Sequence, residues 1–174
     1  MFEISKRYSL AAVVLCCWLG CAAVATTAVA ANAKIAVFPF ELEDFSAAGK
    51  QEPGPNDASH LAQATEEAKQ QLQESGRYIL IDTAGADLGE AKTHGLRNCG
   101  GCEAPIAMNL GADQALIGIV TKISMMEYVV TLRVSDARNG EIVSNFSTDL
   151  RMGASDSWFR GVRWLMKNRV LAPE

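Results

Sequence analysis

The chain has 174 residues, of which 49% are hydrophobic, and its formal net charge is −4. Residues 34–150 contain 9 Lys and Arg against 17 Asp and Glu, whereas residues 151–174 contain 5 against 2. This acidic body with a basic C-terminal segment lacks the clustered Lys and Arg that a nucleic-acid-binding domain needs to displace counterions from phosphates. We therefore expect no nucleic-acid partner.

Residues 1–33 have the features of a secretory signal peptide. Lys6 and Arg7 precede an uncharged apolar segment over residues 10–24, and small residues follow up to Ala33. The apolar segment is near the ~15-residue limit of a signal peptide and shorter than the ~20 residues that a transmembrane helix needs. We expect cleavage after Ala33 and a periplasmic or secreted protein with no membrane span.

Cys21 offers an alternative fate for this segment. It follows Trp18-Leu19-Gly20, which resembles a bacterial lipobox only loosely, because Trp18 stands where an aliphatic residue is expected. A lipoprotein anchored through Cys21 is therefore the less favoured alternative. The remaining residues, 34–174, are enough for one domain with a hydrophobic core, so we expect a single periplasmic α/β domain.

The first half of this domain predicts a β-α-β unit. An apolar run at residues 35–40 indicates a strand, with Pro39 at its exit because proline cannot donate to a strand ladder. Residues 57–75 contain no Gly or Pro and repeat small or apolar side chains at helical spacing, which indicates an amphipathic helix. Residues 78–82 indicate a second buried strand, and the right-handed crossover rule makes the two strands parallel.

Acidic residues lie between the first strand and the helix. Glu41, Glu43 and Asp44 follow the strand directly, and residues 46–56 are rich in Gly, Pro, Ala and polar residues, which predicts a loop. Three carboxylates beyond a strand end are the ligand type of a hard-cation site. They lack the loop glycine and fixed spacing of known calcium motifs. Solvated loop charges are the simpler interpretation, and we predict no metal site.

The second half predicts two short helical stretches followed by three strands. Residues 84–98 are weakly helical, and residues 106–110 indicate a short helix that Gly111 ends. The almost unbroken apolar run at residues 115–123 is typical of a strand buried on both faces. Strict alternation over residues 128–135 indicates a strand that is half buried.

A hairpin is predicted around Arg138-Asn139-Gly140, and its second arm has Ile142, Phe146 and Leu150 on the apolar side. A two-residue turn would place apolar residues of one arm opposite polar residues of the other, whereas a three-residue loop keeps one apolar face. The longer loop also puts Gly140 at the left-handed bulge position. The predicted pairs are Val134 with Ser144, Leu132 with Phe146, Val130 with Thr148, and Tyr128 with Leu150.

Residues 156–170 predict a C-terminal helix capped by Ser155. Arg160, Arg163 and Lys167 form a basic stripe, and Trp164 lies beyond it, outside the apolar arc that should pack on the sheet. Either Trp164 covers a neighbouring loop, or it joins the basic stripe in a docking patch for an acidic partner, since Trp and Arg are frequent at binding hot spots. The apolar arc consists of Trp158, Phe159, Val162, Leu165, Met166 and Val170.

Cys99 and Cys102, separated by two glycines, are the local cluster with the most chemical promise. In an exported protein such a pair most simply forms a disulfide, with Cα atoms about 4.4–6.8 Å apart. A redox-active pair is the second interpretation, because a helix N-terminus near Cys102 favours a thiolate. Zinc would need two further ligands, and His60 and His94 are poorly placed to supply them. Haem attachment would need histidine where Glu103 stands, so we predict no cofactor.

Motifs of common catalytic sites are missing: the sequence has no G-x-S-x-G elbow, H-E-x-x-H, P-loop, or G-x-G-x-x-G after a strand. With two histidines in the chain, acid–base catalysis would depend on carboxylates or on His94. We therefore predict a protein that is not an enzyme. The order of elements predicts an α/β (α+β) fold, with a single mixed sheet of about five strands in β-α-β-α-β-β-β-α order and helices packed on the sheet.

Several short segments resemble known envelope families. Residues 35–40, 75–78, 111–120 and 132–143 are similar to the amino-terminal domain of the Tol-system periplasmic protein and to the periplasmic domain of curli-secretion channel proteins. The chain also resembles uncharacterised secreted bacterial proteins of this size with a cysteine pair. The resemblance implies a domain that binds partners or assembles in the cell envelope and has no catalytic residues. The chain departs from these families in having no propeller, no channel-forming segment, and the Cys99–Cys102 insertion.

Three functions are consistent with the sequence. The first, which we prefer, is a periplasmic binding or scaffolding domain that serves an envelope complex through a protein partner. The second is a thiol–disulfide or metal accessory protein that uses Cys99 and Cys102. The third is a small-molecule-binding protein with its site near Glu43 and Asp44.

Overall fold

The computed structural model describes residues 32–46, 55–124, 127–151 and 157–173. These residues belong to one compact unit, Ala31–Glu174. The expected signal segment with Cys21 and the expected helix cap Ser155 lie outside the described residues, so the division of the chain at Ala33 stays a prediction. Within the described ranges, no helix is long and apolar enough to cross a membrane.

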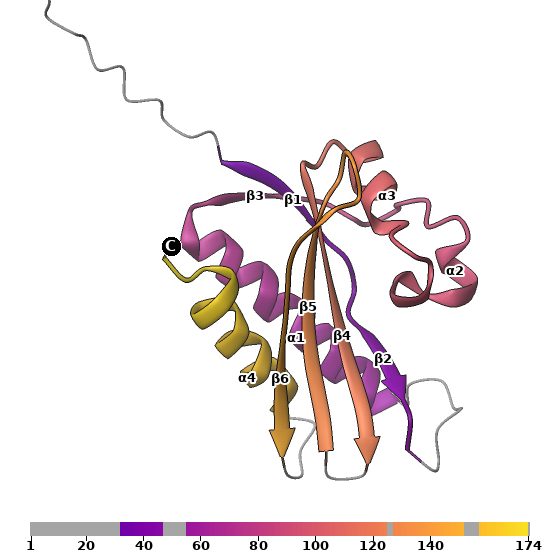
Figure 1. Cartoon of the computed structure of the whole chain (residues 1–174), viewed down its shortest axis with the longest axis vertical. Helices are drawn as coiled ribbons and strands as arrows, with labels where there is room; N and C mark the ends of the chain where they lie inside the picture. The colour runs from indigo at the N-terminus through magenta and orange to yellow at the C-terminus, as the bar shows by residue number, and fades with distance from the viewer. Residues whose placement is uncertain (1–31, 47–54, 125–126, 152–156, 174) are drawn as a thin grey trace, which may run out of the picture. The chain divides into compact units, whose positions relative to one another are not determined.

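One mixed sheet of six strands forms the centre of the fold, which confirms the predicted fold class (Figure 1). The strands are β1 (Ala33–Val37), β2 (Glu41–Asp44), β3 (Tyr78–Ile81), β4 (Gln114–Ser124), β5 (Glu127–Asp136) and β6 (Ile142–Arg151). Their order across the sheet is β3-β1-β4-β5-β6, and β2 pairs with β4. β1 is parallel to β3, as predicted, and to β4, whereas β4, β5 and β6 are antiparallel neighbours.

Strand β2 forms where the sequence predicted that the first strand had already ended, so the predicted strand end at Pro39 is wrong. The predicted loop over residues 46–56 lies almost entirely outside the described residues. Pro39 interrupts the pairing with β4 without ending it. On one side of Pro39, Phe38 N donates to Leu116 O at 3.0 Å. On the other side, Phe40 N donates to Thr65 Oγ1 at 3.0 Å, on helix α1 (Pro55–Ser75). The helix thus supplies the acceptor that the ladder lacks at this point, and the chain then rejoins β4 as β2.

Phe40 and Gly118 make the closest packing in this part of the sheet. A Cβ atom on Gly118 would lie 2.3 Å from Phe40 Cε2 and 2.4 Å from two further ring atoms. Both residues are buried. The aromatic ring therefore occupies the space that any larger residue at position 118 would need.

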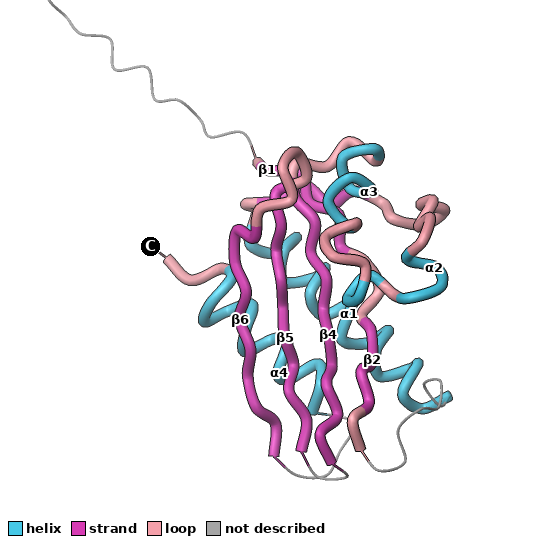
Figure 2. The backbone as a smooth tube through the Cα atoms, turned by 45° about the vertical axis from the view of Figure 1, so that its right-hand side comes forward, coloured by secondary structure: helices cyan, strands magenta, loops and turns pink. Residues whose placement is uncertain are grey.

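Helices α1 and α4 (Ser157–Leu165) lie side by side on one face of the sheet (Figure 1 and Figure 2). α4 continues into η2 (Met166–Val170), a five-residue segment with π-helical hydrogen bonding. The predicted apolar arc faces the core, since Trp158, Val162, Leu165 and Met166 are all buried. Around it are Ala64, Ala68 and Leu72 from α1 and Ile35, Val37, Phe40, Leu116, Val120, Val130, Leu132 and Val134 from or next to the strands.

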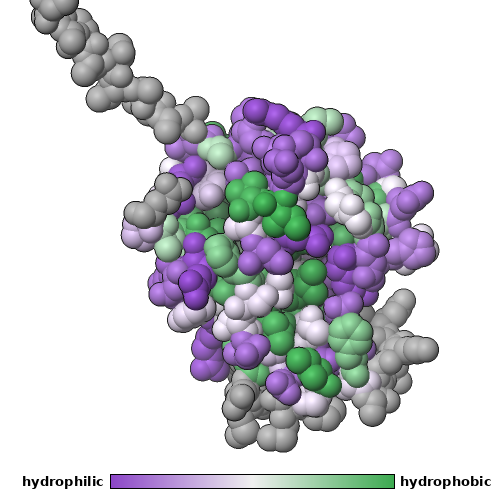
Figure 3. Space-filling view, in the orientation of Figure 1, coloured by the Kyte–Doolittle hydropathy of each residue, from purple (hydrophilic) through white to green (hydrophobic). Residues whose placement is uncertain are grey.

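The opposite face of the sheet is only partly covered. Three short elements pack there against Phe38 and the start of β4: α2 (Ala91–His94), η1 (Leu96–Asn98) and α3 (Glu103–Asn109). Of the weak helical stretch predicted over residues 84–98, only α2 and η1 form. Ile123 and Val143 remain 45% and 56% exposed. In the view of Figure 3, apolar side chains are interspersed with polar ones.

The β5–β6 hairpin has the predicted register over most of its length. All four predicted pairs are present: Val134 with Ser144, Leu132 with Phe146, Val130 with Thr148, and Tyr128 with Leu150. Gly140 has φ +73°, also as predicted. The predicted loop length is wrong by one residue, because Asp136 N donates to Glu141 O at 2.8 Å and the register shifts beside Val134. This bulge leaves Ile142 58% exposed instead of on the apolar side.

Two strands are less buried than their apolar sequences predicted. β3 lies at the edge of the sheet, and Ile79 is 47% exposed. In β4, an unbroken run of buried residues extends only from Ala115 to Gly118, and side chains from Ile119 onward alternate or open to solvent. The reason is the partial cover on the second face, because η1 and α3 pack only near the start of β4.

Candidate functional site

The C-terminal helix presents basic and aromatic side chains to solvent. We call Arg160, Trp164, Lys167 and Arg169 the α4 surface; all four are exposed, and Trp164 is 47% exposed. The Arg169 guanidinium carbon lies 6.0 Å from the centroid of the Trp164 ring, within cation–π range. Trp164 is therefore accessible to a partner, and its predicted docking role stays a prediction.

Arg163, the fourth basic residue of the helix, is bound within the chain. Its Nε and Nη2 donate to Glu67 Oε1 and Oε2, both at 2.7 Å, in a bidentate pair between α4 and α1. Glu67 is buried and also accepts from Gln71 Nε2 at 2.9 Å. The Arg163 guanidinium lowers the pKa of Glu67, and the Glu67 carboxylate raises the pKa of Arg163. Arg163 therefore anchors α4, and its predicted role in partner binding stays a prediction.

Cys99 and Cys102 are joined by a disulfide with a Cα–Cα distance of 5.6 Å, inside the range expected from the sequence. The bond connects the end of η1 to the start of α3, and both cysteines are half-buried. His94 is exposed and does not converge with them. Among the described residues, Glu103 joins Cys99 and Cys102 in a group of three side chains that could bind a metal ion.

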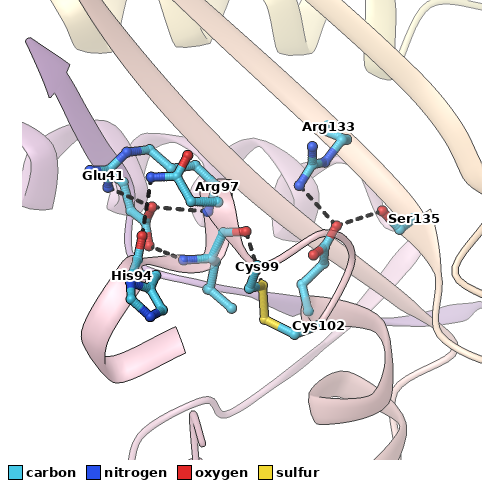
Figure 4. The surroundings of a disulfide bond; sticks show 10 residues. Glu41, His94, Arg97, Cys99, Cys102, Arg133 and Ser135 are labelled. Carbon is cyan, nitrogen blue, oxygen red and sulfur yellow. Dashed lines mark hydrogen bonds and ion pairs between the residues drawn. A yellow bond between two sulfur atoms is a disulfide. The ribbon is translucent and has the colours of Figure 1, made fainter. Parts of the chain in front are cut away.

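Glu41 ties the segment before the disulfide to the sheet (Figure 4). Its Oε1 accepts from Leu96 N at 2.6 Å, and its Oε2 accepts from Arg97 N at 3.1 Å and Arg97 Nη1 at 3.0 Å. These bonds satisfy the free N–H groups at the start of η1. The missed strand β2 is what places Glu41 there, so sequence analysis had no basis for this contact.

Asp44 of β2 does not join Glu41 in a common site. Asp44 pairs with Lys122 of β4 at 3.3 Å, on the opposite side of the strand from Glu41. The hard-cation and small-molecule sites considered near Glu43 and Asp44 therefore gain no support. A recess of about 200 Å³ lies elsewhere, below the ~300–1,000 Å³ of most ligand pockets. It is lined by Val37, Lys69, Leu80, Ile81, Asp82 and Thr83.

Glu103, in the first turn of α3, is a buried carboxylate whose burial and contacts the sequence did not predict. It is 1% exposed. Its Oε1 accepts from Arg133 Nη2 at 3.1 Å and from Ser135 Oγ at 3.1 Å, both on β5 (Figure 4). Its Oε2 is buried with no hydrogen-bond partner in the part of the chain that the structure describes. The signal in the sequence was the polar pair Arg133 and Ser135, which share one face of β5.

The sequence also identifies the family. Residues 33–170 match the profile of a family described as a protein of unknown function (DUF2380). The chain belongs to this family. The match includes both the disulfide region and the α4 surface, so the DUF2380 domain comprises every element from β1 to η2.

Solved structures give weaker likenesses to this DUF2380 chain, and no curated protein matches it in sequence. The LpoB C-terminal domain from Salmonella enterica has a TM-score of 0.48 and 16% identity, over 70% of this chain and 84% of that one. Lipoprotein GNA1162 from Neisseria meningitidis has a TM-score of 0.45 and 20% identity, over 70% and 82%. TolB from Acinetobacter baumannii has a TM-score of 0.41 and 14% identity, over 78% and 26%. Likenesses at this level support no transfer of function, and the predicted resemblance to the Tol and curli families stays a hypothesis.

Proposed function

We propose that this DUF2380 protein is an exported, non-catalytic domain of the cell envelope that binds an acidic segment of a partner protein through the α4 surface. The observation that carries the proposal is Trp164, which is 47% exposed on a helix whose other large apolar side chains are buried or half-buried. Tryptophan is strongly enriched at binding hot spots, and large aromatic side chains are usually mostly buried.

Charge indicates the kind of partner. Lys167 and Arg169 follow Trp164 in the C-terminal segment of a chain whose residues 34–150 are acidic. A basic patch on an acidic body attracts an acidic segment to this face and disfavours its approach elsewhere. Arginine beside an aromatic ring also suits the recognition of carboxylates, because its planar fork binds both carboxylate oxygens.

The α4 surface is held on a fixed platform. Trp158 and Leu165 are buried beneath it, and Gly161 packs so closely that a Cβ atom there would lie 3.1 Å from the methyl carbons of Leu150. The bidentate bonds between Arg163 and Glu67 join α4 to α1. A preorganised surface loses little conformational entropy on binding, which favours a docking role.

The proposed location and the non-catalytic role depend on the sequence. The signal-peptide pattern over residues 1–33 supports export, and a disulfide between Cys99 and Cys102 suits an oxidising compartment. The missing catalytic motifs support a binding domain over an enzyme.

Site-specific photo-crosslinking identifies the partner. A photoreactive residue replaces Asn168, beside Trp164, and in a second strain it replaces Met108, which is 49% exposed on α3. We expect an envelope protein that crosslinks from position 168 and not from position 108. The binding affinity of the purified partner is then measured with Trp164→Ala and Lys167→Glu proteins. Removing a hot-spot tryptophan weakens binding by about 30-fold or more.

Matched variants separate a docking role from a general surface effect. Met108→Ala removes an equally exposed apolar side chain, and Lys34→Glu makes the same charge change at an exposed lysine on β1. Both should leave affinity within about twofold of the original protein, as expected outside a hot spot. Lys167 is chosen over Arg163 because an Arg163 variant would also break the pair with Glu67. Equal affinities for Trp164→Ala and Met108→Ala would reject the proposal.

A further inference from the structure

The two oxygens of the Glu103 carboxylate differ in their hydrogen bonding. Arg133 and Ser135 bind Oε1, whereas Oε2 is buried and has no hydrogen-bond partner among the described residues. A buried charged oxygen without a partner is unfavourable, and such groups in folded proteins commonly mark a bound ion or a chemical role. The carboxylate also lies beside the disulfide, because one of its oxygens and the two cysteine sulfurs are all within 4.8 Å of one another.

We infer that reduction of the Cys99–Cys102 disulfide opens a site for a thiophilic divalent cation such as Zn²⁺, held by the two thiolates and the Glu103 carboxylate. The C-x-x-C spacing is that of common zinc sites. Zn–S and Zn–O bonds of about 2.3 and 2.0–2.2 Å place tetrahedral donors roughly 3.5 Å apart. Small side-chain rotations bring the three donors to that spacing. Gly100 and Gly101, with φ of +69° and +103°, give the loop the backbone freedom to accommodate them.

The surroundings of Glu103 are those of an oriented metal ligand. A ligating carboxylate is normally fixed by hydrogen bonds to its other oxygen, and Arg133 and Ser135 supply these bonds. Charge also balances. Two thiolates, one carboxylate and one divalent cation sum to −1, which the adjacent Arg133 guanidinium neutralises.

The frame of the site does not depend on the sulfur–sulfur bond. Glu41 holds Leu96 and Arg97 on the Cys99 side through three hydrogen bonds. On the Cys102 side, α3 is fixed by Ala104 and Ala107, which are 2% and 0% exposed. Breaking the disulfide therefore leaves both cysteines close to their present positions.

Two steps load the site. A dithiol or phosphine reductant supplies two electrons and two protons accompany them, so the sulfur–sulfur bond breaks, two thiols form, and the reductant is oxidised. The cation then replaces the two thiol protons, which are released to solvent. In the disulfide form both sulfurs lack the thiolate charge, so binding depends on the redox state of Cys99 and Cys102.

Cobalt titration tests the site. Purified protein is reduced with a phosphine under anaerobic conditions and titrated with Co²⁺, and thiolate-to-cobalt charge-transfer absorption is recorded. We expect one cobalt ion per chain, displacement by Zn²⁺, and no such absorption from the disulfide form. Glu103→Gln and Ser135→Ala should each weaken Co²⁺ binding by about tenfold or more. The control Glu66→Gln, which changes an exposed glutamate on α1, should bind like the original protein.

The variants also report on folding. Because Glu103 is buried, circular dichroism of the disulfide form establishes that Glu103→Gln is folded before its affinity is read. Ser135→Ala removes only one hydrogen bond to the carboxylate and serves as the second variant if Glu103→Gln does not fold. Absence of charge-transfer absorption in the reduced protein would overturn the proposal. So would equal affinities for the original protein and the folded variants, because the cysteine pair alone would then hold the ion.

Discussion

Replacing Gly118 with alanine tests the close packing of the Phe40 ring against Gly118, next to the strand interruption at Pro39. The new Cβ would lie 2.3–2.4 Å from three atoms of the Phe40 ring, well inside van der Waals contact. Phe40 is 4% exposed, so the ring has no solvent to move into. Overpacking of this kind destabilises by about 1–3 kcal/mol. At roughly 3 °C per kcal/mol for a domain of this size, Tm should fall by about 3–9 °C in thermal denaturation followed by circular dichroism.

A double-mutant cycle assigns the loss to this contact. Phe40→Leu shortens the side chain and removes the ring, so Gly118→Ala should cost about 0.5–3 kcal/mol less in the Phe40→Leu background than in the original protein. Gly161→Ala is the matched control, because its Cβ would approach Leu150 side-chain atoms no closer than 3.1 Å, against 2.3 Å for the Phe40 ring, and alanine favours the helix by about 1 kcal/mol. Strict additivity of the Phe40 and Gly118 changes would refute the reasoning.

Three further predictions concern hydrogen bonds and the disulfide. Thr65→Val leaves the N–H of Phe40 without its acceptor and should lower the free energy of unfolding in urea by about 1–3 kcal/mol; a loss below about 0.5 kcal/mol would contradict this. The pKa of Glu67 is lowered by its Arg163 partner, so its stabilising contribution is present above the unfolded pKa near 4.5 and is lost as pH falls through the folded pKa. The stability difference between the original protein and Glu67→Gln should therefore shrink between pH 6 and pH 3, and a constant difference would argue against the pair. Reducing the Cys99–Cys102 bond, which closes a four-residue loop, should cost about 2 kcal/mol, measured by denaturation with and without reductant. A double Cys→Ser variant should show the same loss and no response to reductant.

The spacing of apolar residues predicted the elements in which that spacing alone decides which side chains are buried. The hairpin pairs followed from the alternation around Leu132 and Phe146, because one residue of slip would have moved every apolar side chain to the wrong face. The apolar arc of α4 followed from helical spacing in the same way. What periodicity could not show was how completely each face is covered. Ile79 is exposed on the edge strand β3, on the face of the sheet that α2, η1 and α3 cover only in part, which depends on the arrangement of elements and not on the local sequence.

The missed features depend on contacts between distant segments. Pro39 was a sound reason to end the first strand, and only the acceptor on Thr65, 25 residues later than Phe40, lets the chain resume as β2. Glu103 has the sequence context of an ordinary acidic residue in a helix first turn. Its importance arises from Arg133 and Ser135 on β5, which the fold brings to it across about 30 residues of sequence. A local sequence pattern cannot predict a contact between residues so far apart in the chain.

The packing of α1 against α4 affects the order in which parts of the domain can fold. Arg163 meets Glu67 across 96 residues, so the two helices on the same face come from distant parts of the chain. Strands β4 to β6 emerge during synthesis or export before α4, and until α4 arrives Leu132 and Val130 lack part of their cover. Partly formed sheets with exposed apolar surface are the states most open to aggregation and proteolysis. The domain therefore stays open to aggregation and proteolysis until the segment containing Trp158 packs on the sheet.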